Sequence, residues 1–114
     1  MKKYHVSVSH AANDRMYDHF EFLAKVSENA ARNLLSELLK DIKSLELTPM
    51  ANPYFNRPYL ERGKYRYKLS YGRYRIVYQI DKDNVFVDDI QDCRQDDDKN
   101  ILWQDGQSTL EDQI

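Results

Sequence analysis

Four basic side chains in this chain have the types and spacing of a site that acts on a phosphate. Two lie at alternate positions of one predicted strand, one lies on the next strand and one follows the last strand: Arg66, Lys68, Arg75 and Arg94. Because strand side chains alternate between two faces, Arg66 and Lys68 share a face, and we expect Arg75 to join them. Fixed positive charge stabilises phosphates and developing oxyanions. The pattern therefore predicts one composite cationic patch.

Such a patch suits cleavage of RNA by its own ribose 2′-hydroxyl. That reaction needs a base for the hydroxyl, positive charge for the scissile phosphate and an acid for the leaving 5′-oxygen. A lysine made less basic by neighbouring arginines can serve as the base, and arginines can hold the phosphate bidentately. Alternating basic residues also occur on strands that bind nothing, where they keep the sheet soluble. The pattern alone leaves both interpretations open.

The predicted strands that carry three of these residues form a hairpin over residues 65–80, with a turn at Tyr71-Gly72. We expect one cationic face and one apolar face that packs under helices. The predicted apolar face consists of Tyr65, Tyr67, Leu69, Tyr71, Tyr74, Ile76, Tyr78 and Ile80. Three tyrosines of this region are expected to be freer to contact a partner: Tyr54, Tyr59 and Tyr71.

The elements before the hairpin are predicted from hydrophobic periodicity. Alternation predicts a first strand over residues 3–9. Apolar residues that recur at three and four positions then predict two helices. The first helix is capped by Asn13 or Asp14, and the second begins after a break at residues 26–29. So short a break favours an antiparallel helical hairpin.

The remaining segments complete one domain. Three prolines within residues 48–63 exclude regular helix and predict an ordered loop. A polar turn at residues 81–84 leads to a last strand over residues 85–92. The order β-α-α-β-β-β predicts an α+β fold in which a helical hairpin packs on an antiparallel sheet.

Composition narrows the class of protein. The 114 residues suffice for one domain, and no apolar run is long enough to span a membrane, so we expect a cytoplasmic protein. Cys93 is the only cysteine, which excludes an intrachain disulfide and a cysteine cluster for zinc. The three histidines lack ligand spacing, and we expect neither metal nor cofactor.

The formal net charge of −2 conceals two opposite regions. Residues 57–75 carry seven basic side chains and one acidic side chain, whereas residues 81–112 carry eleven acidic and three basic ones. The local charges are therefore +6 and −8. We expect a bipolar molecule with a basic centre and an acidic end, which can repel phosphate or mask a site.

The hairpin also resembles a known family. The runs Arg66-Tyr67-Lys68-Leu69 and Gly72-Arg73-Tyr74-Arg75-Ile76-Val77-Tyr78 are similar to the core hairpin of the RelE/ParE superfamily, the toxins of bacterial type II toxin–antitoxin pairs. The resemblance implies a toxin domain over residues 1–98, followed by an acidic polar tail over residues 99–114. It also implies a cognate antitoxin protein as partner.

Two branches of this family imply different activities, and the resemblance favours the branch that cleaves mRNA because all four of its basic residues are present. In the branch that cleaves mRNA on the ribosome, the matching positions Arg66, Lys68, Arg75 and Arg94 are catalytic, which implies a metal-independent endoribonuclease. Many members of that branch have a tyrosine where this chain has Asn100, and the acidic run at residues 96–98 lies beside it. The ParE branch poisons DNA gyrase by contact and needs no such tyrosine. A degenerate domain that only binds its partner is the third alternative.

Overall fold

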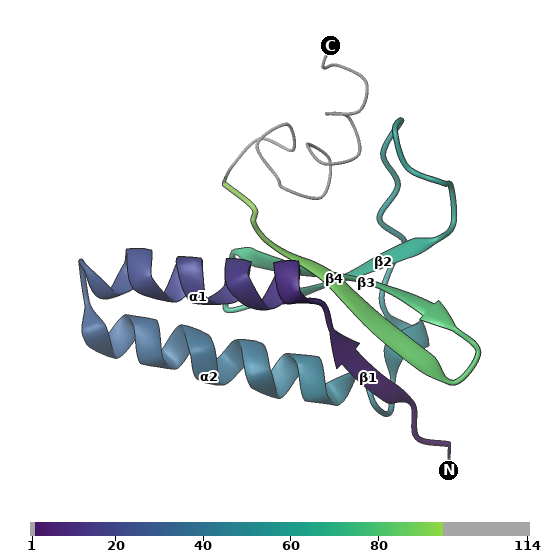
Figure 1. Cartoon of the computed structure of the whole chain (residues 1–114), viewed down its shortest axis with the longest axis horizontal. Coiled ribbons are helices and arrows are strands. Elements are labelled where there is room, and N and C mark those ends of the chain that lie inside the picture. Colours follow the sequence, from purple (N-terminus) through teal and green to yellow (C-terminus); the bar gives the residue numbers. More distant parts are fainter. Residues whose placement is uncertain (1, 95–114) are drawn as a thin grey trace.

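The computed structural model describes residues 2–94 and contains four strands and two long helices. The predicted α+β order is confirmed (Figure 1). The elements are β1 (His5–Val8), α1 (His10–Ala24), α2 (Glu28–Ser44), the short 3-10 helix η1 (Pro49–Ala51), β2 (Tyr65–Ser70), β3 (Tyr74–Asp81) and β4 (Asn84–Asp92). None of the described helices is long and apolar enough to cross a membrane.

The sheet has the strand order β1-β4-β3-β2. The three later strands pair antiparallel, as predicted, but β1 pairs with β4 in parallel, so the sheet is mixed. The parallel pairing is possible because the helical hairpin connects β1 to the rest of the sheet and returns the chain to the same end. Figure 1 shows α1 and α2 side by side, both extending to one side of the strands.

The helices begin at serine caps. Ser9 accepts a hydrogen bond from the Ala12 amide at 3.0 Å, and Ser27 accepts one from the Ala30 amide at 3.1 Å. The start of the second helix agrees with the predicted break, whereas the predicted cap at Asn13 or Asp14 is wrong. A serine hydroxyl directly after β1 satisfies a free amide of the first turn, so the helix cap lies four residues before Asn13 and five before Asp14.

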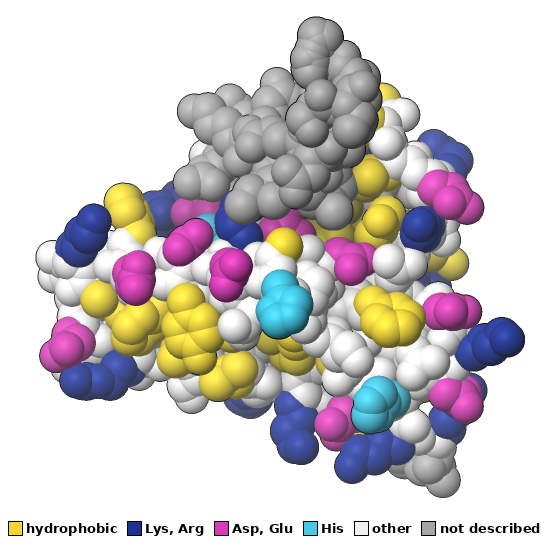
Figure 2. Space-filling view, viewed as in Figure 1, with side chains coloured by type: hydrophobic (Ala, Val, Ile, Leu, Met, Phe, Trp, Pro, Cys, Tyr) yellow, Lys and Arg dark blue, Asp and Glu magenta, His cyan; other side chains and the backbone are white. Residues whose placement is uncertain are grey.

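The main core lies between the helices and one face of the sheet. Its buried side chains include Leu34 and Leu38 from α2 and Tyr74, Ile76 and Tyr78 from β3. Several hydrophobic side chains of the helices and of their connection remain exposed, and Figure 2 shows hydrophobic side chains gathered over the helices. They are Tyr17 and Phe22 of α1, Val26 between the helices and Leu39 of α2.

A second, smaller core covers part of the opposite face of the sheet. Phe55, from the loop before β2, packs with Val77 of β3 and with Leu60, Tyr65 and Tyr67. The prediction that Tyr65 and Tyr67 pack under the helices is therefore wrong, although it is confirmed for Tyr74 and Tyr78. Both faces of the hairpin are partly covered, one by the helices and the other by the loop.

The register of the hairpin explains this difference. Ser70 pairs with Tyr74, which leaves three residues in the connection. Tyr71 and Gly72 both have positive φ, at 53° and 76°, so the chain reverses at these two residues. The prediction that Tyr71 is freer to contact a partner is wrong, because Tyr71 packs against the main core. The expected apolar face required a register shifted by one residue, and such a shift moves every side chain to the other face.

Candidate functional site

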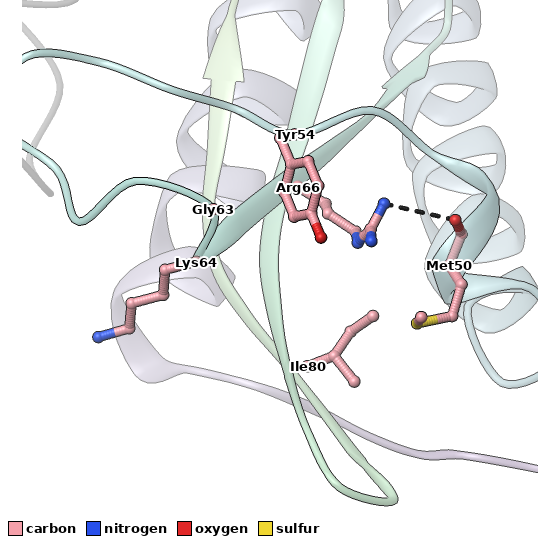
Figure 3. Close-up of a pocket in the computed structure, with 6 residues that line it drawn as sticks. All are labelled: Met50, Tyr54, Gly63, Lys64, Arg66 and Ile80. Atoms are coloured by element: carbon pink, nitrogen blue, oxygen red, sulfur yellow. Dashed lines mark hydrogen bonds between the residues drawn. The ribbon is translucent and has the colours of Figure 1, made fainter.

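Arg66 lies on the edge strand β2 and is held by the loop that crosses before it. It pairs with Tyr78, so its side chain is on the face of the main core. Its Nη1 donates to the Asn52 carbonyl oxygen at 2.6 Å and to the Met50 carbonyl oxygen at 3.4 Å. The guanidinium also lies over the Tyr54 ring, 4.1 Å from its centre (Figure 3). These contacts hold Arg66 Nη1 and the plane of the guanidinium against the loop.

Lys68 is two residues further along β2 and shares the face of Arg66. It pairs with Ile76, and its side chain is half-buried. No hydrogen-bond or ion-pair partner of the Lys68 ammonium is found within residues 2–94. The predicted common face of Arg66 and Lys68 is therefore present, and Lys68 is its available cation.

Arg75 lies on the other face of the sheet. It pairs with Leu69 of β2 and Gln91 of β4, and its guanidinium carbon is 5.1 Å from the centre of the Phe55 ring in the smaller core. The predicted placement of Arg75 beside Arg66 and Lys68 is wrong. The reason is the three-residue connection after Ser70, which sets the opposite register.

Arg94 follows β4 and is bound to a neighbouring carboxylate. Its Nη2 and Nε donate to the two oxygens of Asp92 at 2.7 and 3.1 Å. Burial acts to raise the pKa of Asp92, but the hydrogen bonds from Arg94 outweigh it and lower that pKa below its ordinary value. Because this bidentate pair neutralises the guanidinium, Arg94 presents little net charge to a phosphate.

A shallow pocket of about 230 Å³ lies beside Arg66 (Figure 3). Its lining consists of Met50, Tyr54, Gly63, Lys64, Arg66 and Ile80. Figure 3 shows the Lys64 ammonium pointing away from the pocket centre, whereas the Arg66 guanidinium points toward Met50. The sequence analysis did not select Lys64 for this site, because it precedes the alternating part of the strand. Neither Lys68 nor Arg75 lines this pocket.

A buried polar cluster between α1 and β4 was missed entirely by the sequence analysis. Its members are Arg15, His19, Asp89, Gln91 and Asp92, all less than one tenth exposed. Arg15 Nη1 lies 3.7 Å from Asp89 Oδ1, and His19 Nε2 donates to the Ile90 carbonyl oxygen at 2.8 Å. Burial raises the pKa of Asp89. Helical spacing was the available signal, since His19 is four residues after Arg15 and both lie on the face that holds Met16.

The cluster predicts that stability depends on pH through His19. Burial lowers its pKa below 6.5, and Arg15 lowers it further. Below pH 6.5 the unfolded chain therefore binds a proton that folded His19 resists, so stability falls as the pH falls from 7 to 5. We expect His19→Gln to flatten this dependence in urea unfolding measured at several pH values. The exposed His10→Gln is the matched control and should keep the wild-type slope; equal slopes in all three proteins would contradict the assignment.

Comparisons with known proteins identify the family of this chain. Residues 6–97 match the family described as the ParE toxin of the type II toxin–antitoxin system, parDE. Among solved structures, the chain is similar to one from a chromosomal ParDE toxin–antitoxin system of P. aeruginosa, with a TM-score of 0.64 and 10% identity. That match covers 79% of this chain and 96% of the other. No curated protein matches significantly. The family match spans most of the domain, so this chain belongs to the ParE toxin family of type II toxin–antitoxin systems.

Proposed function

We propose that this ParE-family toxin acts by contact with DNA gyrase rather than by cutting mRNA. The observation that carries the proposal is the position of Arg75, on the face opposite Arg66 and Lys68. Phosphoryl chemistry on a ribose needs its base and its phosphate ligands within hydrogen-bond distance of one substrate. Cations on opposite faces of a sheet do not meet that condition.

The bonds made by two of the other predicted catalytic residues also support action by contact. Arg66 is bound to the carbonyls of Met50 and Asn52, and Arg94 is bound to Asp92. These bonds commit Arg66 Nη1 and Arg94 Nε and Nη2 to the fold, so fewer of their donors are available to a scissile phosphate. A toxin that works through an interface does not need these donors, and the exposed hydrophobic side chains of α1 and α2 offer the apolar area that protein interfaces use.

Ribosome-dependent mRNA cleavage is the second candidate, and Lys68 is the observation that favours it. Its ammonium has no partner within the described residues and shares a face with Arg66. A lysine amine can act as a general base when it lies within reach of the substrate hydroxyl. In this alternative, Lys68 and Arg66 act without Arg75.

A cognate antitoxin is the proposed inhibitor, and the cytoplasm is the proposed location of both proteins. The segment before the hairpin carries exposed basic side chains, among them Arg62 and Lys64. An acidic segment of an antitoxin would complement this charge, which favours fast and specific association. Co-expression with the product of a neighbouring gene, followed by a pull-down at moderate salt, tests this pairing.

The choice between targets is tested by induced expression of the toxin in cells and by gyrase assays in vitro. We expect growth arrest with intact transcripts, accumulated DNA breaks and inhibited supercoiling by the purified protein. Lys68→Ala and Arg75→Ala should change these results by less than about twofold, because these strand residues are not part of the exposed hydrophobic surface of the helices. Phe22→Glu, at an exposed position of α1, should weaken them by about tenfold or more.

The opposite pattern supports the second candidate. Ribosome-stimulated transcript cleavage that disappears in Lys68→Ala, with supercoiling unaffected, would contradict action on gyrase. Lys40→Ala, an exposed change on α2, is the control for unspecific loss of charge. The absence of both activities in a folded protein would favour a domain that only binds its partner.

A further inference from the structure

Within the described residues, the face of the sheet opposite the helices is covered at one end. The smaller core around Phe55 covers β2 and part of β3. A row of paired residues crosses this face from edge to edge, because Ser7 pairs with Phe86, Phe86 with Gln79 and Gln79 with Tyr65. Tyr65 belongs to the smaller core, whereas Phe86 is 36% exposed. Among residues 2–94, nothing covers the end of the face formed by β1 and β4 as the smaller core covers the other end.

A pocket of about 330 Å³ occupies this open end. Its walls combine apolar and polar groups. The lining consists of Ser7, Val8, Ser9, Gln79, Phe86, Val87 and Asp88. Phe86 lies on the same face as Ser7 and supplies an aromatic wall of the pocket. β1 pairs only with β4 among the described strands, and the pocket can be approached from that free edge of the sheet.

Asp88 supplies the charge of this pocket. The bulge between Val77 and Tyr78 leaves Asp88 without a partner in the strand register. Its carboxylate accepts a hydrogen bond from Gln79 Nε2 at 2.7 Å, and this uncharged amide is its direct side-chain partner. No Lys or Arg nitrogen of residues 2–94 forms an ion pair with it. Burial raises the pKa of Asp88, as expected of a carboxylate partly withdrawn from water.

We infer that this pocket receives the guanidinium of an arginine side chain from a partner protein. A partly buried carboxylate is stabilised by a cation that hydrogen-bonds to it, and the second oxygen of Asp88 accepts no hydrogen bond from the described residues. Phe86 offers a ring on which a planar guanidinium can stack. The Ser7 hydroxyl can accept a further N–H. Arginine fits this set better than lysine, whose ammonium neither stacks as a plane nor spreads its donors in a fork.

This arginine site is separate from the cationic hairpin face. Arg66 and Lys68 lie on the face of the main core, whereas Ser7, Gln79 and Phe86 lie on the opposite face. The two surfaces also have opposite charge, so they select different groups of a partner. The inference holds whether the toxin acts on gyrase or on mRNA, and its test requires neither target.

The test uses N-acetyl-arginine N-methylamide as the probe and the full-length protein labelled for NMR. We expect saturable chemical-shift changes at Ser7, Gln79, Phe86 and Asp88. Asp88→Asn keeps the side-chain shape and should weaken binding about tenfold, the value of a lost charge-assisted hydrogen bond. The matched control is Asp81→Asn, an exposed position at the end of β3. This variant should bind the probe within about twofold of wild type.

Two further readouts separate a binding site from a merely structural carboxylate. The citrulline analogue has the same shape without the charge and should not bind, and the lysine analogue should bind more weakly than the arginine probe. Saturation with the arginine probe should lower the pKa of Asp88, because the bound cation favours the ionised form. The inference is overturned if the shifts fall elsewhere or are absent, if Asp88→Asn binds equally well, or if citrulline binds like arginine.

Discussion

Replacing Asp89 by alanine is expected to lower the free energy of unfolding by about 3–5 kcal/mol, the typical cost of removing one member of a buried ion pair. Asp89 is 2% exposed and faces the buried Arg15 of α1. Its carboxylate also accepts hydrogen bonds from the Ile90 amide at 2.8 Å and the Gln91 side chain at 3.2 Å. The substitution therefore removes the carboxylate that connects α1 to β4, and urea unfolding at neutral pH measures the loss.

An exposed ion pair provides the control for Asp89. Asp83 lies 2.8 Å from the Lys2 ammonium, with 74% and 57% of the two side chains exposed. Because solvent screens such a pair, Asp83→Ala should cost less than about 1 kcal/mol. Similar losses for the two variants, or a loss below about 1 kcal/mol for Asp89→Ala, would contradict the expected contribution of the buried ion pair to the free energy of unfolding.

Arg66→Ala is expected to destabilise the protein by about 2 kcal/mol, since hydrogen bonds from a charged group contribute about 1.5–3 kcal/mol. The substitution removes both bonds to the loop carbonyls and the stacking on Tyr54. Without them, the crossing loop loses an attachment to β2. Urea unfolding of the variant gives the change in stability, and amide hydrogen exchange at Tyr54 and Phe55 reports the release of the loop.

Two matched variants distinguish this structural role from catalysis. Arg66→Lys keeps the charge but not the planar fork, so it should recover only part of the stability. Lys68→Ala, on the same face, should be nearly neutral because it removes no contact with a partner among residues 2–94. If Arg66→Ala retains wild-type stability but abolishes toxicity, the residue serves the target and not the fold, which would contradict our assignment.

The sequence by itself determined the secondary structure and its order. Apolar positions at three- and four-residue spacing define α1 and α2, and alternation defines β2, β3 and β4, because each period follows directly from backbone geometry. The superfamily was also recognisable from the hairpin around Arg66 and Arg75. That Arg66 and Lys68 share one face was predictable for the same reason. Both belong to one strand, so their relative faces do not depend on how that strand pairs with its neighbour.

Only the tertiary structure decided which faces and partners these elements acquire. The face of Arg75 depends on the register between two strands, which the turn at Tyr71 and Gly72 sets and periodicity cannot reveal. Three features join residues that are far apart in the chain. They are the parallel pairing of β1 with β4, the hydrogen bonds from Arg66 to loop carbonyls and the pocket at Asp88. Local patterns carry no information on such contacts, because they form only when the helical hairpin and the crossing loop pack on the sheet.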